Sequence, residues 1–171
     1  MTGAGSPRVL LDVVGLVGDH QPDAAWLSNF SPDPVRLDVG RGERSYPTLE
    51  HAYQAAKART AEDHDRVAAA PDPEQAKRAG RALERREDWR EVRTGVMRAA
   101  LAAKFAPGSV AARRLLATGD AVLVELAPHG DELNGLSPQP DGTWRGRNLV
   151  GVLLTERRGQ LRLLPTPSPP R

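Results

Sequence analysis

A helical stripe of apolar residues between positions 87 and 105 is the feature that most constrains the fold of this chain. The apolar residues recur three or four positions apart, the spacing of one face of an α-helix. Pro107 and Gly108 then end the pattern. A helix from Glu87 to Phe105 with so wide an apolar face must cover a core, so the sequence predicts a helix-rich globular domain. The stripe consists of Trp89, Val92, Val96, Met97, Ala100, Leu101 and Phe105.

Other helices are predicted from start and stop signals. Pro47 and Thr48 form a plausible helix start, with the Thr48 hydroxyl as N-cap and Glu50 favoured by the dipole of the first turn. The helices expected after this one are 73–84, interrupted at Gly80, then 109–117, and a last helix capped by Asn148.

Strand signals are fewer. Runs of β-branched and aliphatic residues predict strands at 8–17, 35–39 and 121–126, and a turn at 40–44 leads into a further strand near Tyr46. A few short strands beside several helices indicate the α+β class, with a small β-sheet.

The 171 residues fit one domain. We expect a single compact helix-rich domain from residue 8 to residue 160. The segments 1–7 and 161–171 are rich in Gly and Ser or in Pro, cannot bury apolar surface, and are expected to be flexible tails.

Composition excludes several classes of function. The chain has no cysteine, which excludes disulfides, thiolate metal sites and cysteine nucleophiles. Its formal net charge of +2 is too close to balance for a protein that coats nucleic acid. The histidines are scattered rather than spaced like zinc ligands, and no apolar run approaches the roughly 18 residues of a membrane span. We expect a cytoplasmic protein with no membrane partner.

The basic residues are unequal in type. Of the 24 basic residues, 21 are arginine, and the three lysines are Lys57, Lys77 and Lys104. Because arginine is the usual surface cation here, each lysine raises the question of why an ammonium is present. Lysine, unlike arginine, can lose its proton and act as a base or nucleophile.

The helix after Pro47 carries three polar residues on one face. Glu50, Gln54 and Lys57 follow an i, i+4, i+7 spacing and lie within about 60° of one another. Two interpretations stay open: a solvated polar stripe, which spacing alone favours, or a catalytic group in which Lys57 matters.

A second candidate region follows the strand at 121–126. Glu125 is either hydrated at the end of that strand or a functional carboxylate beside a cation. The loop from 127 to 147 is glycine-rich and leads into a helix N-terminus, an arrangement that can hold a phosphate. Asn148 taken by itself is better explained as a plain helix cap.

A third candidate is aromatic. Trp26 and Phe30 flank Ser28 and Asn29, and such a cluster either stacks a base and bonds its edge or serves packing and turns. Trp89 fits the core stripe of its helix.

In chain order these segments resemble the NADAR family, named for NAD and ADP-ribose. Residues 27–30 resemble the family's LSNF, and residues 46–57 resemble YPTxEHxYQAxK, a long and highly specific block. Residues 146–151 follow the pattern GxNxxG. The further similar segments are 76–81, 88–89, 96–105, 116–119 and 123–125, so the resemblance covers about residues 8 to 158.

The resemblance implies a compact α+β fold and cleavage of an N-glycosidic bond, without metal or cofactor. Two substrates are associated with such proteins: phosphorylated ribosylamino-pyrimidine intermediates of riboflavin synthesis, and ADP-ribosylated guanine in nucleic acid. In both, a ribose C1–N bond breaks beside a phosphate. A carboxylate would stabilise the charge that develops on the ribose ring.

The resemblance assigns roles to particular residues. Lys57 either orients the substrate or, when neutral, attacks a ring-opened C1 to give a Schiff base. Gln54 would hold ribose hydroxyls, and Arg81 or the turn at 146–148 the phosphate. The expected catalytic residues are Glu50, Lys57, Glu125 and Asp131. The expected substrate-binding residues are Ser28, Asn29, Phe30, Tyr53, Gln54, Arg81, Trp89, Asn134, Gly135, Gly146 and Asn148.

One departure from the family pattern concerns the substrate base. Where the family has Asp-x-x-Trp-Gly, this chain has Asp131 to Gly135 with Asn134 at the tryptophan position. Loss of a stacking indole removes about 1–3 kcal/mol of base contact, although Trp144 lies ten residues further on. Either the substrate is altered, or the aromatic wall is supplied from elsewhere. The expected substrate is the ribosylamino-pyrimidine phosphate, and two alternatives remain: hydrolysis of ADP-ribosylated guanine, or nucleotide binding without catalysis, in which the change to Asn134 marks lost catalysis.

Overall fold

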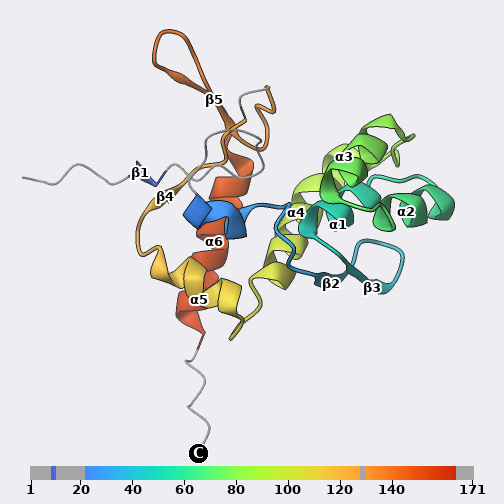
Figure 1. Ribbon diagram of the computed structural model, residues 1–171, viewed down its shortest axis with the longest axis horizontal. Helices are drawn as coiled ribbons and strands as arrows, with labels where there is room; N and C mark the ends of the chain where they lie inside the picture. Colours follow the sequence, from blue (N-terminus) through green and yellow to red (C-terminus); the bar gives the residue numbers. More distant parts are fainter. Residues whose placement is uncertain (1–8, 11–21, 128–129, 165–171) are drawn as a thin grey trace, which may run out of the picture. The chain divides into compact units, whose positions relative to one another are not determined.

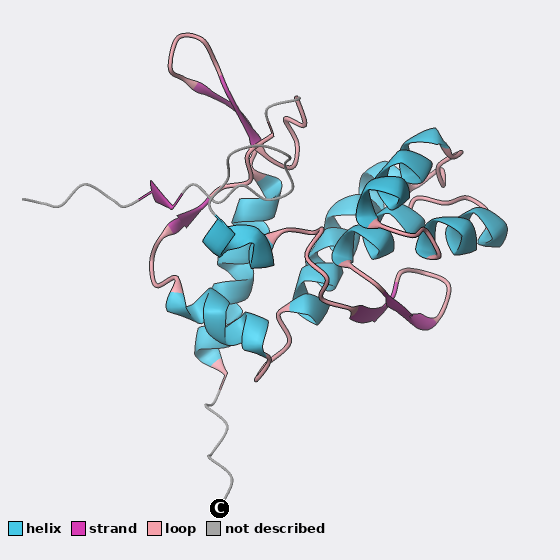
Figure 2. Ribbon diagram, in the orientation of Figure 1, coloured by secondary structure: helices cyan, strands magenta, loops and turns pink. Residues whose placement is uncertain are grey.

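The computed structural model describes residues 9–10, 22–127 and 130–164 (Figure 1). Helical residues far outnumber strand residues in this described part, and the strands are short (Figure 2). The α+β class and the helix-rich character predicted from the sequence are therefore confirmed. The elements are β1 Val9–Leu10, the 3-10 helix η1 Pro22–Leu27, β2 Val35–Asp38, β3 Glu43–Tyr46, α1 Leu49–Ala55, α2 Ala61–Ala68, α3 Pro73–Ala82, α4 Trp89–Lys104, α5 Val110–Ala117, β4 Val122–Leu123, β5 Leu136–Pro138, β6 Trp144–Gly146 and α6 Leu149–Leu163.

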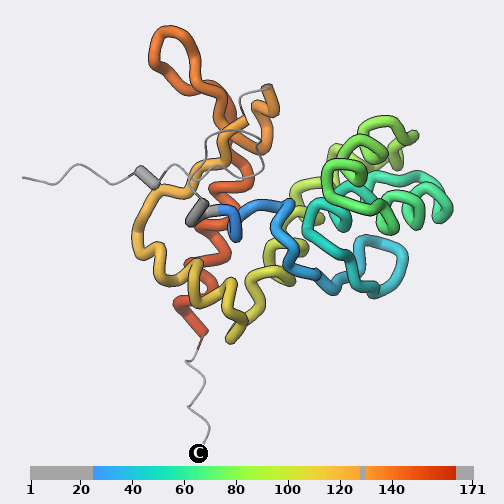
Figure 3. Tube along the Cα trace, viewed as in Figure 1, coloured from blue at the N-terminus to red at the C-terminus, as the bar shows by residue number. Residues whose placement is uncertain are grey.

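The chain divides into two compact units. We call Ser28–Ala106 the central unit, and Met1–Leu27 together with Pro107–Arg171 the terminal unit. In Figure 3 the central unit runs from blue to yellow-green, and the part of the terminal unit that begins at Pro107 runs from yellow to red. Each unit is described by itself.

The central unit is built around α1. Every residue of α1 is buried, because α1 packs against α2, α3 and α4 and against β3. Strands β2 and β3 form an antiparallel hairpin whose register pairs Val35 with Tyr46. The turn between them uses Gly40 at a positive φ of 97°, with the Asp38 carboxylate accepting from the Gly40 amide at 2.6 Å.

The terminal unit is built around α6, which packs against α5 and β4. Strands β1 and β4 pair in parallel, and β5 and β6 form an antiparallel hairpin. The apolar core of this unit includes Leu115, Leu123, Val150 and Leu154, each 1% exposed or less. No helix in the described part of the chain is long and apolar enough to cross a membrane.

Most predicted elements match the structure, with four differences. Helix α3 runs through Gly80 without interruption, and α2 is a separate helix that the sequence did not distinguish. The loop predicted at 127–147 contains the β5–β6 hairpin. Helix α6 continues to Leu163, so positions 161–163 are helical although the predicted domain ends at 160. The predicted strand at 8–17 lies outside the described residues except for β1.

Candidate functional site

The start of α1 fixes the first candidate residues. Thr48 is the N-cap, as predicted: its hydroxyl accepts from the backbone N–H of His51 at 3.4 Å. The His51 ring lies 2.8 Å from the same hydroxyl through Nδ1 and 3.1 Å from the carbonyl of Ala70 through Nε2. Since the first turn is held from both sides, Glu50 has a defined position in it.

Three polar side chains of α1 form one hydrogen-bonded chain. Gln54 Nε2 donates to Glu50 Oε1 at 2.7 Å, and Lys57 Nζ donates to Gln54 Oε1 at 2.5 Å. The exposed fractions of the three residues are 5%, 4% and 8%. The solvated polar stripe that spacing alone favoured is therefore wrong, because α3 and α4 cover this face of the helix as well as the apolar one.

Burial controls the charge of Glu50. Loss of hydration raises the pKa of the Glu50 carboxyl above its usual range, since a charged carboxylate is disfavoured away from water. The hydrogen bond from Gln54 and the positive charges of Lys77, Lys57 and Arg81 act in the opposite direction without cancelling the effect. A carboxyl of this kind keeps its proton closer to neutral pH and suits a general acid.

Aromatic rings surround the Lys57 ammonium. Its Nζ lies 5.2 Å from the centroid of the Tyr53 ring and 5.8 Å from that of Trp89. The two rings meet edge to face with centroids 5.2 Å apart. Trp89 is 6% exposed, so it belongs to the core as its helix pattern predicted and contacts the candidate lysine at the same time.

Gly80 permits the close approach of α3 to this chain of side chains. A Cβ at Gly80 would lie 2.2 Å from Gln54 Oε1 and 2.8 Å from Gln54 Cβ. The glycine that the sequence indicated as a helix interruption therefore makes room for Gln54, whose amide joins the acid to the amine.

The Ser28–Ser31 turn lies against the start of α1. The carbonyl of Asn29 accepts from the backbone N–H of Glu50 at 2.9 Å, and the Ser28 hydroxyl accepts from the N–H of Phe30 at 3.0 Å. Asn29 is 7% exposed, and its Oδ1 has no hydrogen-bond partner among the described residues. Lys77 Nζ lies 5.1 Å from the centroid of the Phe30 ring.

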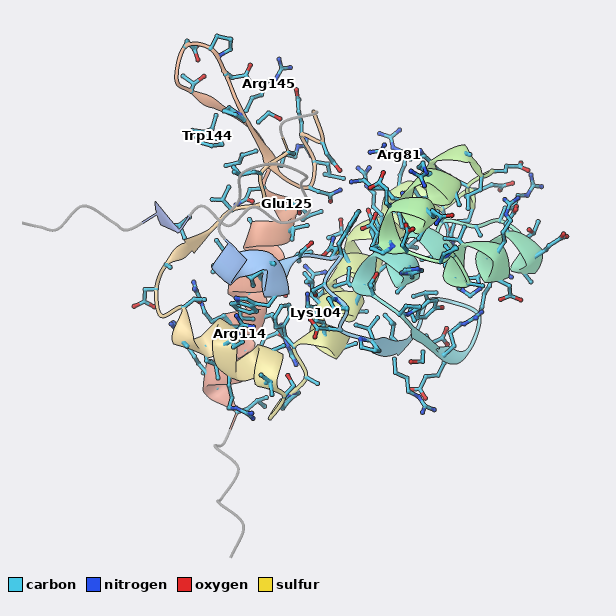
Figure 4. All side chains as sticks on the ribbon, in the orientation of Figure 1. Arg81, Lys104, Arg114, Glu125, Trp144 and Arg145 are labelled. Atoms are coloured by element: carbon cyan, nitrogen blue, oxygen red, sulfur yellow. The ribbon has the colours of Figure 1, made fainter. Side chains whose placement is uncertain are left out.

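Two cations of α3 face the same carboxyl. Lys77 and Arg81 are one helical turn apart, and both act electrostatically on Glu50. In the part of the chain that is described, neither has an ion-pair partner. Figure 4 shows Arg81 on α3. The structure thus brings together Ser28, Asn29, Phe30, Glu50, Tyr53, Gln54, Lys57, Arg81 and Trp89 in the central unit.

The remaining predicted residues belong to the terminal unit. Asn148 is the N-cap residue of α6, as predicted, but it adopts a left-handed conformation with φ of 49° and its side chain makes no capping hydrogen bond, so it is not a plain cap. Its Oδ1 accepts from the backbone N–H of Glu125 at 2.9 Å, and its Nδ2 donates to the carbonyl of Leu123 at 2.9 Å. Asn148 ties the start of α6 to the segment that carries Glu125.

The hairpin fixes Glu125 from its other side. The carbonyl of Glu125 accepts from the N–H of Leu136 at 2.7 Å. A Cβ at Gly135 would lie 2.6 Å from that carbonyl oxygen, and a Cβ at Gly146 would lie 2.1 Å from the carbonyl oxygen of Gly135. These two glycines therefore have a packing role that their sequence context alone did not reveal.

Asn134, which stands at the family's tryptophan position, bonds to Asp131. The Asn134 Nδ2 donates to Asp131 Oδ2 at 2.8 Å, and the Asn134 backbone N–H donates to Asp131 Oδ1 at 3.2 Å. Its Oδ1 is buried without a hydrogen-bond partner in the described segments. Trp144, by contrast, is 44% exposed and stands with Arg145 on the β5–β6 hairpin (Figure 4).

A separate pocket of about 270 Å³ lies beside the end of α1. Arg41, Arg59 and Arg86 line it, but Arg59 pairs with Glu84 and Arg86 holds the Asp88 carboxylate through two hydrogen bonds of 2.6 and 2.9 Å. None of the predicted site residues lines this pocket. Within the described ranges, no group of three or more His, Asp or Glu side chains could hold a metal ion.

Sequence reasoning missed Gly80, Lys77 and Lys104 as contributors to the site. Lys104 donates to the Ser28 carbonyl at 2.6 Å and so contacts the turn that carries Asn29 and Phe30. The available signal was the rarity of lysine, because all three lysines of the chain lie in the central unit.

Comparisons with known proteins identify the family. Residues 17–162 match the NADAR domain family. The chain is 35% identical over 156 residues to N-glycosidase YbiA of Escherichia coli strain K12, a match that covers 90% of this chain and 92% of that protein. It is 34% identical over 146 residues to a riboflavin biosynthesis protein of Vibrio vulnificus strain YJ016, covering 83% of this chain and 37% of that protein.

A solved structure extends the similarity to the fold. The NMR structure of the E. coli protein YbiA superimposes with a TM-score of 0.69 at 34% sequence identity, covering 91% of this chain and 88% of that chain. The prediction of an enzyme that hydrolyses N-glycosyl bonds agrees with the name N-glycosidase that the E. coli relative carries.

Proposed function

The chain belongs to the NADAR family, and from this premise we propose that it is an N-glycosidase that hydrolyses the ribose C1–N bond of a phosphorylated ribosyl substrate. Relatives named N-glycosidase that match 90% of the chain support this reaction class. The observation that carries the proposal is the buried chain Glu50–Gln54–Lys57. Burying an acid and an amine costs free energy, and buried ionisable groups linked in this way are typical of active sites.

Glu50 acts as the general acid in this proposal. Its raised pKa lets it carry a proton to the leaving nitrogen as the C1–N bond breaks, which leaves positive charge on the ribose. A carboxylate would stabilise that charge, and the family resemblance is what proposes Glu125 for this role. Water then bonds to C1 and gives a proton to the Glu50 carboxylate, which restores the acid, and the products are the free base and a ribose phosphate. Asp131 is the other acidic residue that we propose as catalytic.

Lys57 has two proposed roles that differ in covalent chemistry. In one, its ammonium holds Gln54 and orients the bound sugar. In the other, the neutral amine attacks C1 of a ring-opened ribose, the C1–N bond to the base breaks and the base leaves with a proton, and water later hydrolyses the Schiff base that remains. The aromatic rings of Tyr53 and Trp89 beside Nζ support the first role through cation–π contact.

The proposed substrate-binding residues follow from the family resemblance. Gln54 and Asn29 offer polar groups to ribose hydroxyls, and Arg81 offers a charge to the phosphate. The remaining residues proposed to bind substrate are Ser28, Phe30, Tyr53, Trp89, Asn134, Gly135, Gly146 and Asn148. The domain that carries them is proposed to span 8–160, in a cytoplasmic protein.

For the substrate we favour a ribosylamino-pyrimidine phosphate from riboflavin biosynthesis. The name of the Vibrio vulnificus relative supports this choice. ADP-ribosylated guanine is the second candidate, and the exposed Trp144 beside Arg145 favours it, since an aromatic ring and a cation suit a nucleic-acid strand. A nucleotide binder without catalysis is the third.

One experiment separates these functions. The purified protein is incubated with a ribosylaminopyrimidine 5′-phosphate and, separately, with an oligonucleotide that carries ADP-ribosylated guanine, and free base is measured by mass spectrometry. Glu50→Gln and Lys57→Arg should abolish release with a nearly unchanged melting temperature, while Glu62→Gln, an exposed acid on α2, should remain fully active. Full activity of both site variants would remove the mechanism.

The substrates also distinguish themselves. Release from the pyrimidine phosphate alone supports the riboflavin-type substrate, and release from the oligonucleotide alone supports the second candidate. Binding of ADP-ribose by wild type and Glu50→Gln without release of any base would identify a binder. Borohydride treatment during turnover tests the Schiff base, because reduction would leave a sugar mass on Lys57 only if that intermediate forms.

A further inference from the structure

Lys104 is a buried cation that the proposed reaction does not use. It is the last residue of α4 and is 5% exposed (Figure 4). Its Nζ donates to the carbonyl of Ser28 at 2.6 Å and to the hydroxyl of Ser31 at 2.5 Å. The Asp33 carboxylate is 3.8 Å away and half exposed, so it compensates the buried charge incompletely.

Burying an ammonium in this place costs free energy, which suggests that Lys104 is kept for a function. Burial lowers the pKa of Lys104 to about 8, which shows that the surroundings disfavour the charged form, although Asp33 acts in the opposite direction. An aliphatic side chain of similar length would fill the same space without this cost. The chain also prefers arginine as a generic cation.

The two groups to which Lys104 donates hydrogen bonds belong to one tight turn. The N–H of Ser31 donates to the Ser28 carbonyl at 3.1 Å, which closes the turn around Asn29 and Phe30. Lys104 reaches this turn from a position 76 residues away in sequence, so the contact joins α4 to the segment before β2. The ammonium therefore fixes the two ends of the turn, Ser28 and Ser31. The residues between them, Asn29 and Phe30, make their contacts elsewhere.

One of those two residues contacts the candidate acid, and the other contacts a cation that acts on it. The Asn29 carbonyl receives the Glu50 N–H at 2.9 Å, and the Phe30 ring lies under the Lys77 ammonium. Asn29 Oδ1 is buried without a hydrogen-bond partner among the described residues, and a buried acceptor of this kind calls for a donor from elsewhere. A sugar hydroxyl is a donor of suitable chemistry.

We propose that Lys104 is a positioning residue whose ammonium holds the Ser28–Ser31 turn so that Asn29 accepts a hydrogen bond from a ribose hydroxyl beside Glu50. This inference rests on the proposed function for the identity of the sugar. In this proposal Asn29 and Glu50 contact the substrate, and Lys104 acts on the substrate only through the turn that it holds. The substrate class it implies is one with a free hydroxyl on the ribose next to the bond that breaks.

Two variants test the contact. Lys104→Met keeps the length of the side chain and removes both of its hydrogen bonds to the turn. The fold should survive because the Ser28 carbonyl still accepts from the Ser31 N–H. Ser31→Ala removes one acceptor and keeps the lysine. Arg90→Met, an exposed change on the same helix, is the control. Each is compared with wild type for kcat and KM on a ribosylaminopyrimidine 5′-phosphate, and for amide hydrogen exchange by NMR.

The expected result has two parts. In Lys104→Met, KM should rise at least tenfold with a smaller change in kcat, and the amides of Ser31 and Glu50 should exchange at least tenfold faster while that of Met97 in α4 does not change. Ser31→Ala should give a smaller rise in KM, and Arg90→Met none. A general loss of stability would instead accelerate exchange at Met97 as well, and that outcome would overturn the inference.

The two proposals fail in different ways. If wild type releases no base, the proposed function fails, and the exchange of Ser31 and Glu50 still decides whether Lys104 holds the turn. If wild type is active and Lys104→Met has unchanged KM or unchanged exchange at these amides, Lys104 is not a positioning residue, although the proposed function stands.

Discussion

In the central unit Glu50 is held through its side chain, whereas in the terminal unit Glu125 is held through its backbone. Gln54 bonds to the Glu50 carboxyl and to Lys57, so one acid, one amide and one amine form a continuous chain. For Glu125, Asn148 and the β5–β6 hairpin bind the N–H and the carbonyl. The first arrangement sets the protonation of its carboxyl, and the second sets the course of the main chain that carries the carboxyl.

The contrast teaches where each kind of mutation should act. Changes in side-chain chemistry at the central unit should alter activity more than stability, because the backbone of α1 is held independently by its cap and its packing. Changes at the terminal unit should alter stability first, because its polar side chains and glycines serve the backbone.

The largest expected effect is the loss of activity in Glu50→Gln. Removing a general acid should reduce kcat by about 10²–10⁴-fold. Stability should change little, since the amide has the shape of the protonated acid that burial favours. Turnover and thermal unfolding are measured on the same preparation. Activity within a factor of three of wild type would break the contrast on the central side.

Asn148→Ala should give the largest loss of stability. It removes hydrogen bonds to the Glu125 N–H and the Leu123 carbonyl and places an alanine at a φ of 49°, which together cost about 2–3 kcal/mol of unfolding free energy. Urea denaturation measures this loss of unfolding free energy. Asn148→Gly loses the same hydrogen bonds without the backbone strain and should be less destabilised. Equal stability of all three proteins would show that Asn148 does not tie α6 to this segment.

A glycine pair tests the close approach of α3 to α1. In Gly80→Ala the new Cβ overlaps the Gln54 side chain, so we expect a loss of about 1–3 kcal/mol and a fall in kcat as Gln54 moves. Gly95→Ala in α4 meets no atom within 4 Å and should stabilise the protein by about 0.5–1 kcal/mol. Denaturant midpoints and turnover of both variants decide it. A neutral Gly80→Ala would mean that Gln54 can move without consequence.

Local patterns in the sequence predicted most of the elements, and the family, correctly. The apolar stripe gave α4 within two residues at its start, and the Thr48 cap and the strand at 35–39 also agree with the structure. These features depend on residues close together in the chain. The motif around Glu50 was sufficient for the family because its residues are contiguous.

Features that depend on packing between distant segments were not predictable. Spacing placed Glu50, Gln54 and Lys57 on one face of a helix but could not tell that α3 covers this face. Gly80 resembled a helix breaker because its neighbours in sequence give no other reason for a glycine. The residue that requires it, Gln54, lies 26 positions earlier in the chain. For Asn148 the cap pattern was present, yet its side chain bonds to residues more than 20 positions earlier in sequence.

The smallest expected effect concerns pH and compares one buried cation from each unit. Arg158 in α6 is 4% exposed and donates to Thr118 and Ala121, and its guanidinium stays charged at any moderate pH. Lys104 has a pKa of about 8 in the folded protein against 10.5 in the unfolded chain. Between these values the unfolded chain holds a proton that the folded protein has lost, so the unfolding free energy rises with pH.

From pH 7 to pH 9 the contribution of Lys104 should therefore rise by about 1 kcal/mol. The measurement is the difference in unfolding free energy between wild type and Lys104→Met at the two values of pH, in which the other titrating groups cancel. A difference that stays constant, or that falls, would show that Lys104 keeps its proton across this range and that the Asp33 carboxylate compensates its charge after all. The central unit would then resemble the terminal unit in holding a permanently charged cation.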